Sequence, residues 1–371
     1  MNKAVRRLEW TVSSFMILNP LAAVVGMIWL AKAGLLDNPV IWIFGFIYAV
    51  GANLGITAGY HRLLSHRSYE AHPWVEWFFL LMGASAFEGS ALKWSSDHRR
   101  HHSHVDTEED PYSIMKGFWH AHMGWLFWKD SVDLPIEKVA DLQKNRRVMF
   151  QHRYYVPIAI VMGFLVPMLV GAVFGSALTG LIVAGSFRIF MNQQSTFFIN
   201  SLCHMIGKQT YSKEISARDS FLVALLTHGE GYHNFHHTFQ IDYRNGVRWY
   251  HWDPTKWTIL SLKWVGLAKK LRTISPSEIM KARLQAEGVR LSHRGFSPER
   301  IEQMKAKVLE AQIRWRKMKD EYAAMKKHAL DAGEEKMRVL RYEIEMARAE
   351  FRWALKQWRV SMKMELVPVR R

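Results

Sequence analysis

Four runs of mainly apolar residues restrict what this chain of 371 residues can fold into. Crossing the hydrocarbon core of a bilayer takes about 20 apolar residues in a helix, and short links join the runs in pairs. We therefore predict two transmembrane helical hairpins. Arg188 and Asn192 interrupt the last run, and polar side chains at such a depth usually face protein or a cavity. The runs are residues 14–31, 40–60, 155–173 and 177–199.

A fifth apolar stretch, residues 74–87, has about 14 residues, which is short for a span, so it predicts a buried or interfacial segment. The first run follows a basic segment but lacks a convincing signal-peptide cleavage site, and we expect it to be retained as a span. Lys3, Arg6 and Arg7 share a side with the basic stretches that follow each hairpin. The positive-inside rule makes that side, with both ends of the chain, cytoplasmic.

The composition agrees with a membrane protein. The chain is 49% hydrophobic yet carries a net charge of +17, a combination that suits apolar spans flanked by basic residues. Nucleic acid is not expected as a partner, because the recognised binding motifs are absent. The single cysteine, Cys203, excludes an intramolecular disulfide and suits a site that faces a reducing compartment.

Nine histidines in four short clusters predict a metal site, because neutral imidazole is the commonest protein ligand for iron, zinc and copper. Nine imidazoles are too many for one ion, so their number indicates a two-metal centre. With four spans, all four clusters lie on one side of the membrane. The clusters are His61-x4-His66, His98-x2-His101-His102, Asn200-x3-His204 and His233-x2-His236-His237.

The spacing within the clusters favours helices. Residues at i, i+3 and i+4 lie on one face of an α-helix, so the three rings of each triplet can converge. His61 and His66 would lie about 140° apart on an ideal helix, which fits best where the second span ends and the chain loosens. Cysteine ligands are absent, which excludes a structural thiolate zinc site. Iron, copper, zinc and nickel all remain compatible with imidazole ligands, and a lipid-embedded substrate favours oxidation by iron.

These patterns predict an all-α integral membrane protein, in which four transmembrane helices in two hairpins lie under a cytosolic helical cap that holds a histidine-rich two-metal site. The predicted segments are a cytosolic N-terminal segment 1–13, the first hairpin 14–60, cap residues 61–154, the second hairpin 155–199, cap residues 200–296 and a basic helical extension 297–371.

The clusters and their surroundings also resemble those of a known family, the membrane fatty acyl desaturases, most closely the bacterial relatives of stearoyl-CoA delta-9 desaturase. The resemblance runs from about residue 12 to residue 260. It is carried by residues 55–67 (GITAGYHRLLSHR), 94–102 (WSSDHRRHH), Asp110-Pro111, 122–126 (HMGWL), 200–204 (NSLCH), 229–239 (GEGYHNFHHTF) and 242–246 (DYRNG).

The resemblance implies four membrane helices under a cytosolic cap, in the inner (plasma) membrane of a bacterium. It implies two iron ions held by the nine histidines, with Asn200 linked to one iron through water. The implied reaction is O2-dependent desaturation of a saturated acyl chain, bound to CoA or to lipid, giving a cis delta-9 double bond. Ser95 and Ser96 stand where the animal acyl-CoA enzymes place a basic residue thought to contact CoA, which favours a lipid- or carrier-bound chain.

Further residues receive expected roles. By family alignment Trp94, Thr196 and Phe197 should line the kink of the acyl tunnel, and Ala49 and Asn53 should lie at its closed end, where a small Ala49 could admit a longer chain. Carboxylates can orient ligand imidazoles through the second ring N–H. The candidates for that role are Asp97, Glu108, Asp110 and Glu230, and a structural cap or salt bridge is the alternative for each.

Electrons must come from elsewhere. The chain has no dinucleotide-binding fingerprint, no cysteine set for an iron–sulfur cluster and no haem-binding domain. We expect a separate donor, such as a ferredoxin, a rubredoxin or a cytochrome b5-like protein, steered by the basic cap. The rivals to a desaturase are a membrane di-iron hydroxylase of fatty acids or alkanes, and a silent scaffold with a degenerate metal site.

The C-terminal extension differs from the rest of the chain. Ser297-Pro298 is a helix start, and Gly333 marks a break, so the extension is either one long helix or a two-helix hairpin. Ile301, Met304 and Val308 recur at helical spacing. Three roles are open for this segment: a solvated helix, self-association into a homo-oligomer, or docking on anionic lipid.

Overall fold

The computed structural model describes residues 7–128, 136–327 and 334–364, and this part of the chain is mostly helical. Contacts divide the chain into two compact units: residues 1–208 with 215–273, and residues 209–214 with 274–371. Lys3, Arg6 and Gly333, which the sequence-based expectations used, lie outside the described residues.

The first unit contains most of the elements. In chain order they are α1 (Trp10–Lys32), α2 (Pro39–Leu54), η1 (Gly55–Ser65), β1 (Glu70–Ala71), α3 (Pro73–Ala84), α4 (Ala91–His104), η2 (Ile114–Lys116), α5 (Phe118–His122), η3 (Gly124–Phe127), η4 (Ile136–Val139), α6 (Ala140–Gln143), α7 (Arg146–Arg153), α8 (Tyr155–Ile160), η5 (Val161–Leu165), α9 (Val166–Val173), α10 (Ala177–Thr179), η6 (Gly180–Phe187), α11 (Arg188–Asn200), α12 (Leu202–Met205), α13 (Phe221–Leu226), α14 (His233–Thr238), α15 (Pro254–Trp264) and β2 (Ala268–Lys269).

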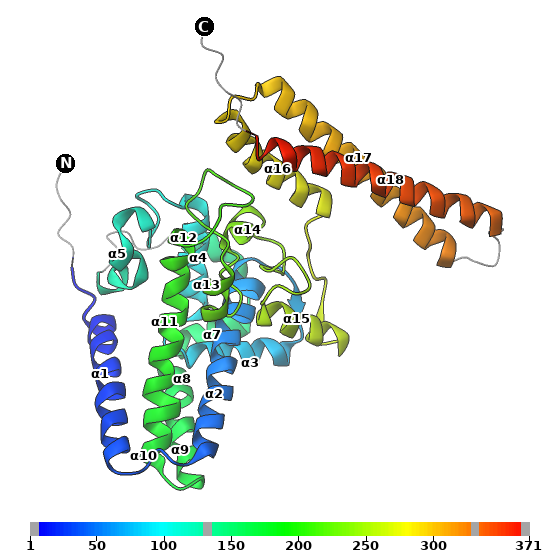
Figure 1. Ribbon diagram of the computed structural model, residues 1–371. Coiled ribbons are helices and arrows are strands. Elements are labelled where there is room, and N and C mark those ends of the chain that lie inside the picture. The colour runs from blue at the N-terminus through cyan, green and yellow to red at the C-terminus, as the bar shows by residue number, and fades with distance from the viewer. Residues whose placement is uncertain (1–6, 129–135, 328–333, 365–371) are drawn as a thin grey trace. The chain divides into compact units, whose positions relative to one another are not determined.

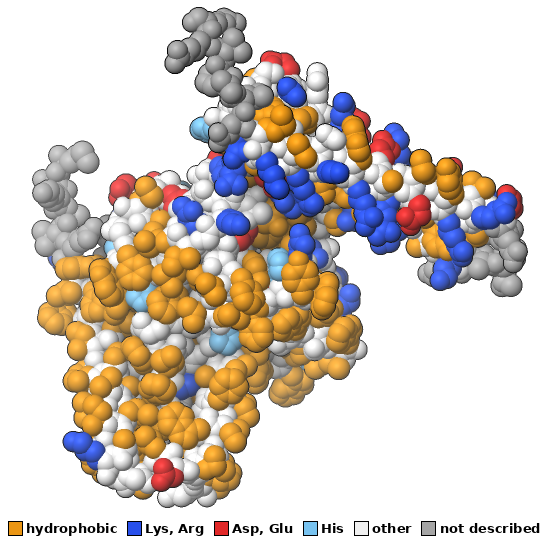
Figure 2. Space-filling view, in the orientation of Figure 1, with side chains coloured by type: hydrophobic (Ala, Val, Ile, Leu, Met, Phe, Trp, Pro, Cys, Tyr) orange, Lys and Arg blue, Asp and Glu red, His pale blue; other side chains and the backbone are white. Residues whose placement is uncertain are grey.

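Long helices form the lower part of this unit (Figure 1). Among the described residues, three are long and apolar enough to cross a membrane: Trp10–Lys32, Pro39–Ser65 and Tyr155–Val173. Large apolar side chains on them are exposed, including Ile17, Leu18 and Phe46. Figure 2 shows such side chains covering the outside of the bundle, which is what lipid contact requires.

The fourth predicted run forms a continuous helix through α10, η6 and α11, but it is not among these candidate spans. The reason is the polar group of residues Arg188, Asn192, Gln193 and Gln194, which lowers its mean hydropathy. The expectation that the interrupting residues face protein is confirmed. Arg188 is 2% exposed and donates to the backbone oxygens of Ala184 and Ser85, and Asn192 donates to that of Ala49.

The cap lies at one end of the bundle. Its two short strands pair antiparallel, Glu70 opposite Lys269 and Ala71 opposite Ala268. Helix α3, in the stretch predicted to be buried or interfacial, has 12 residues, fewer than the about 20 that a span requires. It exposes Trp74 and buries Phe79 and Leu80, as that expectation requires.

The second unit comprises three helices: α16 (Pro276–Ser292), α17 (Pro298–Lys327) and α18 (Glu334–Ser361). Ser275 begins α16 with a reciprocal capping box to Glu278. The three helices share an apolar core that includes Leu291, Val308 and Trp358. The extension therefore contains two helices, α17 and α18, packed on each other, and the compact unit also includes α16.

Close packing within the bundle gives the first prediction. A methyl group at Gly180 would lie 2.3 Å from the backbone oxygen of Pro167 and 2.6 Å from the Cα of Gly171, and backbone atoms cannot move aside cheaply. We expect Gly180→Ala to destabilise the protein by about 1–3 kcal/mol, seen as a lower melting temperature in detergent. At Gly185 the nearest atom would be 3.4 Å away, so Gly185→Ala should melt like the unchanged protein. Equal melting of both variants would contradict this packing.

Candidate metal centre

The nine clustered histidines converge into two groups. The first comprises His61, His66, His98, His102 and His236, and the second His101, His204, His233 and His237. Within each group the possible ligand atoms lie within 4.8 Å of one another. Eight of the nine are buried, and His102 is partly buried. The arrangement has the ligand number and burial of a two-metal centre.

Helices α4 and α14 each contribute to both groups, and helix geometry explains the division. Residues four apart share a face, so His98 and His102 of α4 enter the first group, as His233 and His237 of α14 enter the second. Neighbouring residues on an α-helix point about 100° apart around the helix axis. His101 of α4 therefore enters the second group. By the same rule His236 of α14 enters the first.

His61 and His66 meet because the end of the second span is a π-helix. The backbone N–H of His66 donates to the oxygen of His61 at 3.1 Å, an i to i+5 bond. This wider turn places residues five apart on nearly one face, whereas an α-helix would separate them by about 140°. The ring centroids lie 4.8 Å apart. The expected loosening of the chain is thus a regular, hydrogen-bonded turn.

The spacing of the nitrogens fits bound metal. His61 Nε2 lies 2.9 Å from His236 Nε2, His66 Nε2 lies 2.8 Å from His98 Nε2, and His233 Nε2 lies 3.0 Å from His237 Nε2. Two nitrogens bound at right angles to one metal, each at about 2.0–2.1 Å, would be about 2.9 Å apart. Ring nitrogens gathered at this spacing point their lone pairs at a shared position. The residues present therefore fit a pair of metal ions.

Protonation agrees with ligand function. Burial, followed by the neighbouring imidazoles, holds the pKa of His98, His102 and His236 well below the usual range. The same causes lower the pKa of His233 and His237. These rings are neutral at physiological pH, and neutral imidazole is the form that binds metal.

Outward hydrogen bonds select the tautomer of three rings. Asp110 Oδ1 accepts from His101 Nδ1 at 2.8 Å, and Glu230 Oε2 lies 3.1 Å from His61 Nδ1. Ser216 Oγ lies 2.7 Å from His204 Nδ1 and donates its own proton to Asp106. Each ring thus carries its proton on Nδ1 and leaves Nε2 free to bind metal. Two of the four predicted carboxylates, Asp110 and Glu230, make these contacts.

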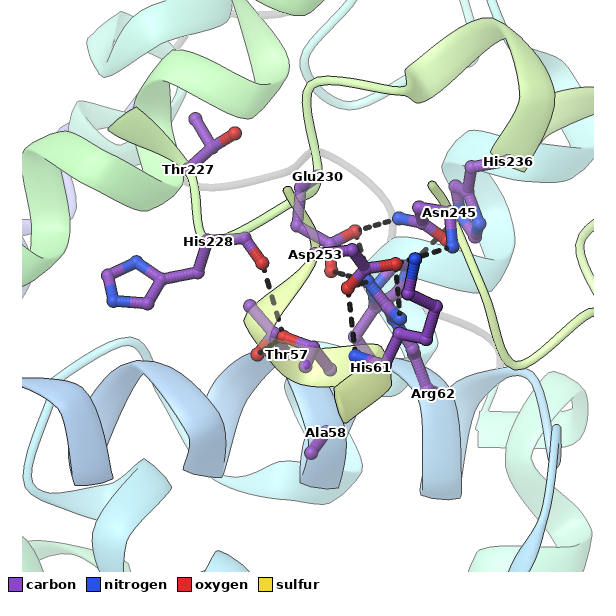
Figure 3. A network of polar contacts seen from close by, with 12 residues as sticks. Thr57, Ala58, His61, Arg62, Thr227, His228, Glu230, His236, Asn245 and Asp253 are labelled. Carbon is purple, nitrogen blue, oxygen red and sulfur yellow. Dashed lines mark hydrogen bonds and ion pairs between the residues drawn. The ribbon is translucent and has the colours of Figure 1, made fainter. Parts of the chain in front are cut away.

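A buried ion-pair network holds Glu230 in place (Figure 3). Arg62 donates to Glu230 at 2.8 Å and to Asp253 at 3.0 Å, and its side chain is 1% exposed. Asn245 Nδ2 also donates to Glu230. Burial alone would raise the pKa of Glu230, but Arg62 and His61 oppose it, and the pKa falls to about 2. Glu230 is therefore ionised beside His61. Neither Arg62 nor Asp253 was predicted to act at the site: Arg62 lies inside the first histidine cluster, but its contacts to Glu230 and Asp253 are made far along the chain.

The other two predicted carboxylates behave differently. Glu108 does not reach the site: it lies in the loop that follows α4, its side chain is 93% exposed, and it pairs with Lys116. Asp97 lies on α4 one residue before His98, lines the cavity described next, and pairs with Lys93.

A cavity of about 1040 Å³ adjoins both histidine groups. His61, His98, His101 and His233 form part of its wall, and the predicted tunnel residues Trp94, Thr196 and Phe197 line it with Asn200. Much of the remaining wall is apolar, with contributions from Phe15, Met16, Ile56, Phe87, Ala159, Ile160 and Phe164.

The predicted tunnel-end residues lie elsewhere. Ala49 and Asn53 are not among the described residues that line this cavity; Asn53 lies 3.5 Å from His228, and Ala49 accepts from Asn192. Their role at the end of an acyl tunnel stays a prediction.

One lining residue was missed by the sequence analysis. Trp94 Nε1 donates to Glu88 Oε2 at 3.3 Å, and burial raises the pKa of Glu88 to about 8. Glu88 is therefore neutral at physiological pH, which allows it to lie in an apolar wall.

Comparison with known proteins identifies the family. The fatty acid desaturase family model matches residues 37–262, more than half of the chain. The chain belongs to the fatty acid desaturase family. It is 47% identical over 245 residues to a probable acyl-CoA desaturase of Schizosaccharomyces pombe, an alignment that covers 66% of this chain and 51% of the relative. It spans about half the length of the yeast relatives it matches.

Two further relatives are covered more fully. Stearoyl-CoA desaturase 5 of Bos taurus is 38% identical over 283 residues, which are 74% of this chain and 83% of the relative. The sn-1 stearoyl-lipid 9-desaturase of Anabaena variabilis is 35% identical over 227 residues, 61% of this chain and 81% of the relative.

In this desaturase-family protein, Glu230 should control metal affinity. Glu230→Gln keeps the shape of the side chain but removes the charge that accepts from His61 and pairs with Arg62. We expect metal affinity to fall about 10–100-fold, as for other outer partners of histidine ligands, measured by iron titration of the purified protein. Glu108→Gln is the matched control, since that side chain is exposed. Equal affinities in the two variants would show that the carboxylate does not support the site.

Proposed function

We propose that this protein is an O2-dependent di-iron fatty acyl desaturase that introduces a cis double bond, at the delta-9 position, into a long saturated acyl chain. One observation carries the proposal: two groups of inward-facing imidazoles border the same largely apolar cavity. Its volume of about 1040 Å³ is slightly larger than the about 300–1,000 Å³ typical of ligand pockets. Such a cavity suits an extended hydrocarbon chain beside a metal pair.

The chain's own residues would perform three tasks. The histidines of the two groups would hold two iron ions, which supply the oxidation of unactivated C–H bonds with O2 when bound. Trp94, Thr196 and Phe197 would hold the acyl chain against His61 and His98, because correct placement of the reacting bond supplies much of the rate. The apolar wall would exclude water from the reaction. Asn200, which also lines the cavity, would contact one metal through a water.

The relatives differ in the group to which the acyl chain of the substrate is attached. The S. pombe relative is named an acyl-CoA desaturase and the A. variabilis relative a stearoyl-lipid desaturase. Ser95 and Ser96, both buried on α4, offer no positive charge to a CoA phosphate. We propose an acyl-CoA or lipid-linked chain, with electrons delivered by a ferredoxin, a rubredoxin or a cytochrome b5-like protein.

The membrane arrangement is proposed on the same basis. Arg188 and Asn192 of the fourth helix donate to backbone oxygens of the protein, so residues 177–200 can serve as the fourth span beside the three candidate spans. Four spans place both termini and the histidine groups on one side, which we take as the cytoplasmic side of a bacterial inner membrane.

Product analysis tests the proposal. The protein, expressed with an electron donor in a bacterium that lacks aerobic desaturation, should yield a cis-delta-9 monoene that requires O2, read by mass spectrometry of its fatty acids. His101→Ala should abolish the product, because it removes a member of the second histidine group. His104→Ala, on the same helix but outside both groups, should retain it. A hydroxylated product would instead identify an oxygenase.

The neutral state of Glu88 predicts a pH dependence. Below its pKa of about 8 the side chain is uncharged, and above it a buried carboxylate would face the apolar chain. Affinity for a saturated acyl ligand should therefore fall, by up to about tenfold per pH unit, as the pH rises above 8. Equilibrium binding across this range measures it. Glu88→Gln, which cannot ionise, should bind equally throughout. If the affinity of the Glu88→Gln variant still fell with rising pH, a group other than Glu88 would be responsible for the pH dependence.

A further inference from the structure

Helix α18 carries an apolar surface that the core of its own unit does not use. One face, with Leu340, Ala347, Ala354 and Trp358, is buried. A second face exposes large side chains: Val339 is 47% exposed, Tyr342 68%, Met346 55%, Trp353 59% and Val360 43%. These five residues, here called the α18 strip, recur at intervals of three, four and seven residues, so they lie in one line along the helix.

Basic side chains flank this strip toward the C-terminal end of α18. Residues 351–364 contain Arg352, Lys356, Arg359 and Lys363 and no acidic residue. All four are exposed. Arg352, Lys356 and Arg359 fall next to Trp353 and Val360, on one side of the strip. Lys363 lies two residues beyond the end of α18 at Ser361. Figure 2 shows basic and apolar side chains interspersed along the C-terminal helices.

The five acidic residues of α18 all lie before residue 351. Three of them form ion pairs: Glu335 with Arg338, Glu345 with Arg348, and Glu350 with Arg314 of α17. Within the described residues, the basic side chains after residue 351 take no part in these pairs. The half of α18 that carries Trp353 and Val360 is thus the positively charged half.

A second copy of the chain would fit this surface poorly. If the strip were a coiled-coil seam, Val339, Met346, Trp353 and Val360 would take one core position of the heptad. Within α18, which ends at Ser361, the other core position would hold Tyr342, Ala349 and Lys356. Lys356 would oppose the same lysine of a parallel partner. An anionic surface reverses the sign of that interaction, because lysine beside Trp and Val is what an interfacial helix presents to acidic lipid.

We propose that the α18 strip is a docking surface for a bilayer of anionic lipid. Trp353, Tyr342 and Met346 would enter the boundary between headgroups and acyl chains, where amphipathic aromatic rings are favoured. Arg352, Lys356, Arg359 and Lys363 would contact the lipid phosphates. The chain joins this unit at Ile274 to a unit with three candidate spans, so the α18 strip belongs to a chain that is itself held at a membrane.

The test uses the full chain in lipid nanodiscs, one copy per disc. Cys203, the single native cysteine, is fully buried, so a nitroxide attached at Met346→Cys reports on the α18 strip. A nitroxide at Lys317→Cys on α17, where the native side chain is 76% exposed, is the reference. Collision with dissolved oxygen, which concentrates in lipid, is compared with collision with a water-soluble nickel reagent. The discs contain phosphatidylcholine alone or with phosphatidylglycerol.

We expect the label at position 346 to become lipid-accessible only when phosphatidylglycerol is present, and the label at 317 to stay in water. Each removed positive charge should weaken docking about fivefold. The double variant with Lys356→Gln and Arg359→Gln should therefore lower the ratio of docked to undocked protein about thirtyfold. Lys307→Gln with Lys319→Gln, the same charge loss at exposed sites of α17, should leave it unchanged.

Two results would overturn the proposal. One is a label at 346 that stays equally accessible to water in both kinds of disc. The other is spin–spin coupling between labels of two copies in detergent, which would assign the strip to self-association. Neither result bears on desaturation, since the strip lies outside both histidine groups and outside residues 37–262 that match the family.

Discussion

Nine imidazoles whose ring nitrogens face one another in a buried site constrain everything around them. A ring that presents its Nε2 lone pair inward must donate its Nδ1–H outward, and an unpaired buried donor costs about 1–3 kcal/mol. Glu230, Asp110 and Ser216 accept from three of these rings. Glu230 is in turn a buried charge, and Arg62, which also pairs with Asp253, supplies the opposite charge. The ion-pair network of Figure 3 is thus a consequence of the ligand geometry.

The cavity also constrains the packing of the membrane helices. Thr196 and Phe197 of α11 line the cavity, and α11 must connect the polar cap with the apolar bundle. Arg188 and Asn192 bond to backbone oxygens of neighbouring segments and fix how those segments pack. Arg188 also lies 5.0 Å over the ring of Tyr48. Polar residues that lower the hydropathy of the helix therefore hold the bundle in register.

Sequence alone could predict those parts of the fold that depend on local periodicity. The i, i+4 pairs of α4 and α14 converge as the spacing requires, and Arg188 faces protein as its depth requires. The pairing of His61 with His66 needed a π-helical turn, which has no simple residue signature. Glu108 and Asp110 are two residues apart in the same loop, and only tertiary contacts decide that one is exposed while the other binds His101. Arg62 contacts Glu230 and Asp253 across more than a hundred residues of sequence, which periodicity cannot reveal. The neutral state of Glu88 depends on its burial, which periodicity does not reveal either.

Electrostatic neutrality connects the metal centre with the cavity. Burial lowers the pKa of the histidines and raises that of Glu88, so both kinds of group lose their charge where they border the apolar wall. Glu230 keeps its charge beside His61, and its partner Arg62 lies within about 3 Å. A hydrocarbon chain could not displace water from a wall of unpaired ions, since their desolvation would cost more than its burial returns. The pairing of Glu230 and the neutral state of the histidines and of Glu88 therefore allow a metal pair and a hydrocarbon chain to share one cavity.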